Sequence, residues 1–134
     1  MPRWSRLFPG VPEQVAQARL FTRSVLHDRP EVEAATLVVS ELATNALRHT
    51  ASGGPGGAFT VSVAVRSDGV MIAVDDLGSQ TSEPAAGEDA DMLAISGRGL
   101  PLVAAIAKEW GTAATKSGRC VWAELRGGDE PDVG

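Results

Sequence analysis

The chain has 134 residues, a formal net charge of −5 and 43% hydrophobic residues. This composition favours one folded domain, and the negative charge counts against a nucleic-acid-binding domain, which normally carries a basic face. The single cysteine, Cys120, excludes an internal disulfide framework and a multi-thiolate metal site, and no apolar run is long enough to cross a bilayer. We therefore expect a cytoplasmic protein with one domain over residues 1–126 and a flexible acidic tail over residues 127–134.

Two helices are predicted in the first part of the chain. The first covers residues 12–26, with a proline in its first turn, and residues 4–8 before it could form a short edge strand. The second covers residues 31–49, where apolar side chains recur at spacings of three and four and form a continuous stripe. A glycine-rich loop over residues 50–58 follows.

The next segment has the pattern of a β-hairpin. Residues 59–66 alternate between apolar and polar side chains, which indicates a half-buried antiparallel strand. Residues 68–69 are Asp-Gly, a hairpin turn signal. Residues 70–74 are uniformly apolar, so we expect the central strand of the sheet, buried on both faces and ending at Asp76.

The remaining elements define the predicted architecture. Residues 80–96 have no periodicity and are interpreted as a mobile loop of the kind that often acts as a lid, and residues 99–110 predict a third helix with Gly111 as its C-terminal cap. Residues 112–116 and 119–125 predict a second hairpin. The order of elements indicates an α+β two-layer sandwich, in which three helices cover one face of a mixed, mostly antiparallel sheet.

Glu41 and Asn45 lie four residues apart on the second predicted helix, one above the other and beside the apolar stripe. A carboxylate and an amide on a largely buried face are costly unless they are satisfied. A Mg²⁺ site needs only one or two protein oxygens besides phosphate and water, so Asn45 could supply a ligand and Glu41 a base. Taken alone, the pair also fits a solvated helix face.

Two further segments fit nucleotide binding. Asp76 follows the central strand, where its carboxylate could accept a hydrogen bond from the 6-amino group of adenine, and Gly78 would let the base approach the backbone. Gly97, Arg98 and Gly99 precede a helix, whose first N–H groups and dipole suit a phosphate. A strand-terminating turn and an ordinary glycine turn are the alternative interpretations.

The ordered set of motifs resembles the GHKL ATP-binding superfamily. The Glu-Leu-Ala-Thr-Asn stretch resembles the N-box, and the segments around Asp76 and Gly97 resemble the two glycine boxes. The pattern is most similar to the stand-alone anti-sigma-factor serine kinases of the actinobacterial type, over residues 9–125. The matching segments are residues 41–49, 74–78, 97–103, 110–111 and 118–125.

This resemblance implies a Bergerat fold that holds ATP and Mg²⁺ between the helices and a lid over residues 79–96. Glu41 would be the general base, Asn45 would ligate the metal, and Asp76 would bind adenine. The other residues implied to contact the nucleotide are Gly78, Gly97, Arg98, Gly99, Leu100 and Cys120. The family often has threonine near the adenine-binding aspartate, at the position of Cys120, and cysteine is a poorer hydrogen-bond partner.

The implied function is regulatory. The resemblance implies a homodimeric serine kinase that binds a sigma factor and phosphorylates a serine of an antagonist protein, with the first helix and its Arg19 as a candidate partner surface. The alternative is a non-catalytic nucleotide-binding regulator that acts by protein–protein contact alone. The catalytic half of a two-component histidine kinase is not expected, because no long helix carries a phosphoacceptor histidine. Direct contact with nucleic acid or membrane is not expected either.

Overall fold

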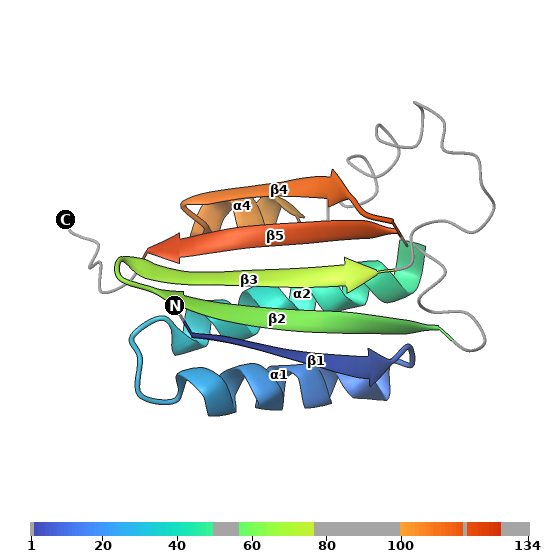
Figure 1. The fold of residues 1–134 in the computed structure, drawn as a ribbon, viewed down its shortest axis with the longest axis horizontal. Helices are drawn as coiled ribbons and strands as arrows, with labels where there is room; N and C mark the ends of the chain where they lie inside the picture. The colour runs from blue at the N-terminus through green and yellow to red at the C-terminus, as the bar shows by residue number, and fades with distance from the viewer. Residues whose placement is uncertain (1, 50–56, 77–99, 117, 127–134) are drawn as a thin grey trace.

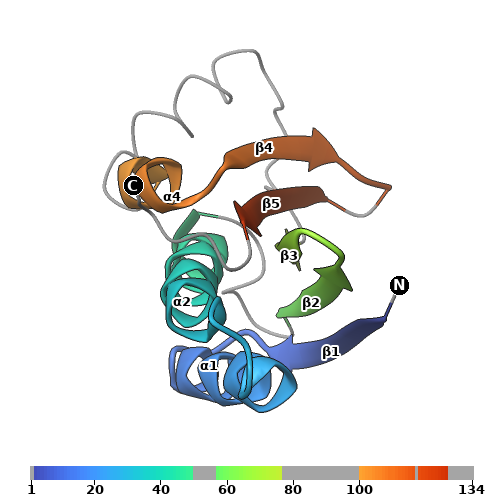
Figure 2. The same cartoon turned by 90° about the vertical axis from the view of Figure 1, so that its left-hand side faces the viewer.

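The computed structural model describes residues 2–49, 57–76, 100–116 and 118–126. The elements are β1 (Arg3–Pro9), α1 (Glu13–Leu26), α2 (Val32–His49), β2 (Ala58–Arg66), β3 (Gly69–Asp76), α4 (Leu100–Ile106), β4 (Glu109–Ala114) and β5 (Arg119–Arg126). The five strands form one sheet, and the helices lie against one of its faces (Figures 1 and 2). The predicted α+β sandwich is confirmed. The predicted lid and the acidic tail lie outside the described residues.

The sheet has the strand order β1-β2-β3-β5-β4, and each of these neighbouring pairs is antiparallel. The central position of β3 and the edge position of β1 agree with the sequence. Burial of β3 on both faces is wrong, however. Val70, Ile72 and Val74 are buried beneath the helices, whereas Met71 and Ala73 are only partly buried. They lie on the other face, which no described helix covers.

The helices pack through the apolar stripes that the sequence predicts. In α1, Ala18, Thr22 and Leu26 are buried at spacings of four, and the Thr22 hydroxyl donates to the Ala18 carbonyl at 3.0 Å. Helix α2 lies between α1 and α4 (Figure 2) and contributes the longest buried stripe. No helix in the described part of the chain is long and apolar enough to cross a membrane. The buried residues of α2 in the core are Ala35, Val38, Val39, Leu42, Ala43 and Ala46.

The third predicted helix is shorter than expected. Helix α4 ends at Ile106, and Trp110 and Gly111 belong to β4 rather than to a helix and its cap. The Lys108 amide donates to the Glu124 carbonyl at 2.8 Å, so pairing with β5 replaces the next helical turn. Trp110 still packs against the core, now from a strand, which explains why its spacing fits the helical stripe.

Gly111 is required by the close packing of β4 against Trp122. A Cβ atom at this position would lie 2.9 Å from Cζ2 of the Trp122 ring. We expect Gly111→Ala to lower the free energy of unfolding by about 1–3 kcal/mol, because the bulky ring must shift. Urea unfolding of this variant and of Ala113→Ser, an exposed neighbour in β4, checks the prediction. Equal stability of Gly111→Ala and the wild type would contradict it.

Candidate functional site

Three segments meet at one end of the sheet. Helix α2 and strand β3 run in the same direction, so their carboxyl-terminal ends lie together (Figure 1). Strand β4 also runs in the direction of β3, because both pair antiparallel with β5. Since only residues 107 and 108 join α4 to β4, helix α4 must begin towards the end where β3 finishes. Asn45 and Asp76 therefore lie towards the same end of the sheet, and the start of α4, at Leu100, is directed towards that end.

Glu41 and Asn45 lie on the edge of α2 that faces α4. Thr36 and Ser40 line a groove together with residues of α1, which marks the opposite edge of the helix. Five residues turn an α-helix by about 140°, so Glu41 and Asn45 are displaced by that angle from Thr36 and Ser40. Asn45 is 7% exposed, whereas Glu41 is half-buried. The predicted pair is thus at the border of the core, not on a fully solvated face.

The side-chain amide of Asn45 has an unsatisfied polar atom. Its Nδ2 is buried and has no hydrogen-bond partner in the described part of the chain. Such an unpaired group costs about 1–3 kcal/mol, so native proteins rarely keep one without a use. The oxygen and nitrogen of an amide are assigned from their surroundings, so either atom can occupy this place. An amide oxygen there fits a Mg²⁺ ion that takes its other ligands from phosphate and water.

Asp76 and Cys120 lie on opposite faces of the sheet. Asp76 is 4% exposed and shares the helix-covered face with Val74. Cys120 pairs in register with Asp75, and it lines a hollow on the other face with Met71. Because side chains alternate along a strand, Cys120 does not join Asp76, contrary to its predicted role in the nucleotide site. Burial, together with a hydrogen bond to Asp75, raises the pKa of the Cys120 thiol to about 12.

The residue that does share the face of Asp76 is Arg119. The two are register partners on β3 and β5, and Arg119 has the same side-chain direction as the buried Val121 and Ala123. Sequence reasoning missed this residue. Counting in steps of two back from Val121 would have assigned Arg119, not Cys120, to the helix-covered face. Gly78, Gly97, Arg98 and Gly99 lie outside the described residues, so their predicted contacts with a nucleotide stay predictions.

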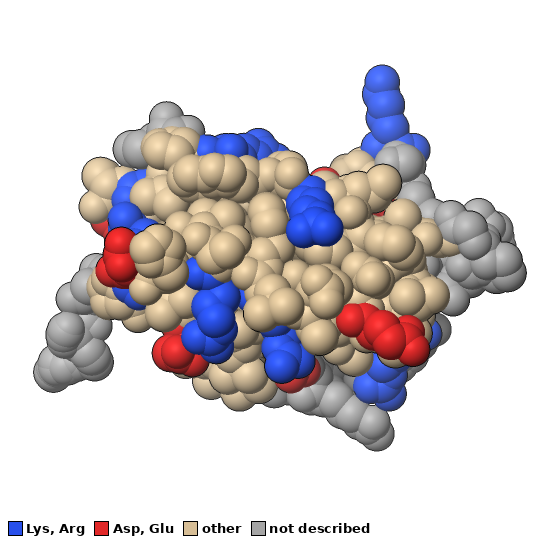
Figure 3. All heavy atoms as spheres, turned by 90° about the horizontal axis from the view of Figure 1, so that it is seen from below, with Lys and Arg blue, Asp and Glu red and all other residues tan. Residues whose placement is uncertain are grey.

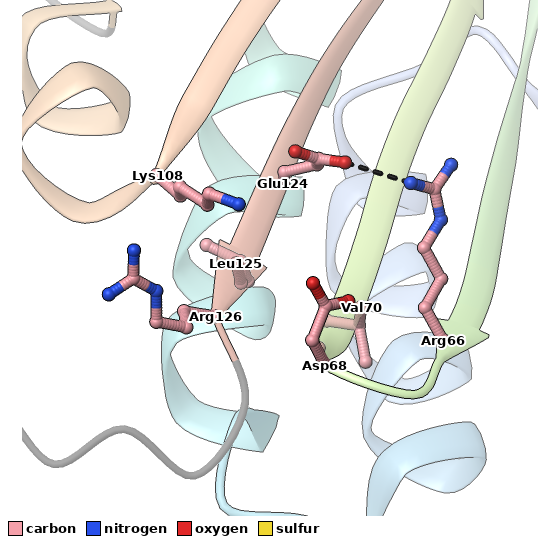
Figure 4. Close-up of a pocket in the computed structure, with 8 residues that line it drawn as sticks. Arg66, Asp68, Val70, Lys108, Glu124, Leu125 and Arg126 are labelled. Carbon is pink, nitrogen blue, oxygen red and sulfur yellow. Dashed lines mark hydrogen bonds and ion pairs between the residues drawn. The ribbon is translucent and has the colours of Figure 1, made fainter.

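The opposite end of the sheet carries a small polar hollow of about 10 Å³ (Figure 4). Arg66 donates through Nη1 to Glu124 Oε2 at 2.8 Å, and Lys108, Arg126 and Asp68 also line the hollow. This volume is sufficient for about one water molecule. The charges of both signs and the small space are those of a structural ion-pair cluster, so the candidate site remains the end that holds Asn45 and Asp76.

The fold is that of an α+β sandwich with helices on one face of an antiparallel sheet, and the buried carboxylate of Asp76 and the buried amide of Asn45, which has no partner among the described residues, lie at the ends of β3 and α2. A sequence model of the histidine kinase-like ATPase domain matches residues 8–125. The chain belongs to this family, which is of the GHKL type, and membership implies ATP binding. The superfamily resemblance is thereby confirmed. A comparison with curated proteins finds no match for the chain.

Proposed function

We propose that this protein binds Mg²⁺-ATP at the end of the sheet formed by α2, β3 and the start of α4, and that it is an anti-sigma-factor serine kinase. The observation that carries the proposal is the buried Asn45 amide, whose Nδ2 has no partner in the described residues, in a chain of the histidine kinase-like ATPase family. Without a ligand such an amide only costs stability.

Asp76 and Asn45 would hold the two ends of the nucleotide. The Asp76 carboxylate would accept a hydrogen bond from the 6-amino group of adenine, and its burial makes that bond strong and selective. The Asn45 amide oxygen would hold Mg²⁺, which when bound neutralises charge on the phosphates. Gly97, Arg98 and Gly99 would surround the phosphates, as the resemblance implies.

Glu41 would act on the protein substrate. It lies one helical turn before Asn45 and is only partly buried, so a serine from a partner can reach it. Its carboxylate would accept the serine hydroxyl proton while the serine oxygen bonds to the γ-phosphorus and the bond to ADP breaks. The products would be phosphoserine and ADP. The new phosphate would weaken the antagonist's own contacts by repulsion and desolvation.

The partner surface would include α1. Figure 3 views the molecule from the side of α1 and β1 and shows basic and acidic side chains interspersed among uncharged residues, with more basic than acidic groups in view. Arg19 lines the groove between α1 and α2, and Leu20 beside it is 58% exposed. Exposed leucine next to arginine suits a protein surface with apolar and acidic side chains. We assign this surface to a sigma factor, an antagonist or a second copy of the chain.

Calorimetry on Asn45→Leu tests the nucleotide site. We expect the variant to bind Mg²⁺-ATP at least tenfold more weakly, because the ligand for Mg²⁺ is lost. We also expect its free energy of unfolding without nucleotide to rise by about 1–3 kcal/mol, because an unsatisfied polar group is removed.

Ser40→Ala, on the opposite edge of α2, is the matched control and should change neither quantity. A variant that binds ATP like the wild type would refute the role of Asn45. Incubation of the wild type with Mg²⁺-ATP and candidate antagonist proteins separates the kinase from the alternative. Nucleotide binding without phosphoserine formation on any antagonist would support a non-catalytic regulator.

A further inference from the structure

Arg119, whose side chain carries hydrogen-bond donors, stands opposite the buried Asp76 in the sheet. The two residues are opposite each other in the β3–β5 register, where Cα atoms are about 4.5–5.5 Å apart. Both side chains leave the sheet on the helix-covered face, as the burial of Val74 and Val121 along the same strands shows. Arg119 is the first residue of β5 and is itself half-buried, so part of its side chain is exposed at this end of the sheet.

A hydrogen-bond donor next to an acceptor on the protein is complementary to the edge of adenine that carries the 6-amino group. The 6-amino group donates, and the ring nitrogens on either side of it, N1 and N7, accept. Asp76 can satisfy only the amino group, because a carboxylate has no proton to give. A guanidinium has five donors in a rigid plane, so Arg119 can supply the second half of the pattern whatever else it contacts.

We propose that Arg119 is a base-recognition residue: its guanidinium donates to N1 or N7 of the adenine whose amino group Asp76 accepts. The inference rests on the proposed ATP binding and deepens it, because it names the part of the nucleotide that this chain reads with two side chains. Asp76 alone would tolerate any base with an amino group in reach. The pair selects a base that offers a donor and an acceptor side by side.

The experiment measures Kd by calorimetry for ATP, 1-deaza-ATP, 7-deaza-ATP, purine riboside triphosphate, GTP and adenosine. The proteins are the wild type, Arg119→Met and Arg126→Met, which removes a matched arginine at the other end of β5. We expect the wild type to bind ATP at least tenfold more tightly than one of the two deaza analogues. Arg119→Met should lose that difference by binding ATP more weakly, and Arg126→Met should retain it.

Purine riboside triphosphate, which lacks the 6-amino group, distinguishes a direct contact of Arg119 with the base from an indirect effect of the substitution on Asp76. Its weaker binding should persist in Arg119→Met, because Asp76 still distinguishes it from ATP. If Arg119→Met keeps the wild-type preference for ATP over the deaza analogues, the inference is overturned. It is also overturned if the variant loses affinity for ATP but not for adenosine, since Arg119 would then contact phosphate. Tighter binding of GTP than of ATP by the wild type would overturn it as well.

Two controls keep this inference distinct from the proposed function. Thermal unfolding tests whether Arg119→Met is folded. If the variant is unfolded, the affinities of the wild type for ATP and the two deaza analogues decide, and equal affinities overturn the inference. A wild type that binds no nucleotide overturns both proposals. A wild type that binds ATP through Asp76, with Arg119→Met unchanged, overturns only the role of Arg119.

Discussion

Replacing Glu41 with glutamine is expected to slow phosphoryl transfer to the partner's serine by about 10²–10⁴-fold, the usual contribution of a positioned general base. The substitution preserves size and hydrogen-bonding capacity but removes the group that takes the proton. Glu41 is half-buried at the edge of α2 and is not expected to contact the nucleotide itself. Mg²⁺-ATP binding should therefore stay within about threefold of the wild type. Single-turnover transfer of labelled phosphate, with calorimetry in parallel, measures the two quantities.

Glu33→Gln is the matched control for this experiment. Glu33 lies on the same helix, but it is exposed and accepts from Arg23 of α1 at 3.0 Å, away from α4. Glu33 also lines the groove that holds Arg19, so the rates are compared at a saturating concentration of the partner. Under that condition Glu33→Gln should leave the transfer rate nearly unchanged, because the exposed ion pair contributes little to the stability of the fold. If Glu41→Gln and Glu33→Gln transfer phosphate equally fast, Glu41 is not the base. If only ATP affinity falls in Glu41→Gln, the residue belongs to nucleotide binding instead.

Asp76→Ala is expected to weaken ATP binding by about 10–100-fold, the range of a hydrogen bond to a charged group in a buried place. Its neighbour Asp75 provides a closely matched control variant. Asp75 has the same side chain one residue away but lies on the opposite face, where it contacts Cys120. Asp75→Ala should bind ATP within about twofold of the wild type. Equal losses in the two variants, measured by calorimetry, would show that neither aspartate recognises the base directly.

Much of the fold could be predicted because its patterns are local. The apolar stripe of α2 and the alternation of residues 59–66 specify a helix and a strand with one buried face each. The end of α4 could not be predicted in this way, because the helical spacing continues to Trp110. The pairing of Lys108 with Glu124 ends the helix, and that pairing depends on a strand later in the chain.

The candidate site could be predicted only where a polar residue stands within an otherwise apolar, buried pattern. Asn45 and Asp76 could be selected for this reason, and both are buried. The role of Cys120 follows from its family position alone, whereas the alternation of side chains along β5, counted from Val121, places Arg119 rather than Cys120 on the helix-covered face. The uniformly apolar residues 70–74 were ambiguous. An apolar Met71 does not reveal whether a helix covers it.

The adjacent aspartates at the end of β3 impose a constraint on the length of the β2–β3 hairpin. Because side chains alternate with a period of two, deleting or inserting one residue within β3 while the β2 pairing is kept would exchange the faces of Asp75 and Asp76. The Asp-Gly turn at residues 68–69 lies at the far end of the same strand. Natural variants of this protein should therefore change the hairpin by two residues at a time, or absorb an odd change in a β-bulge.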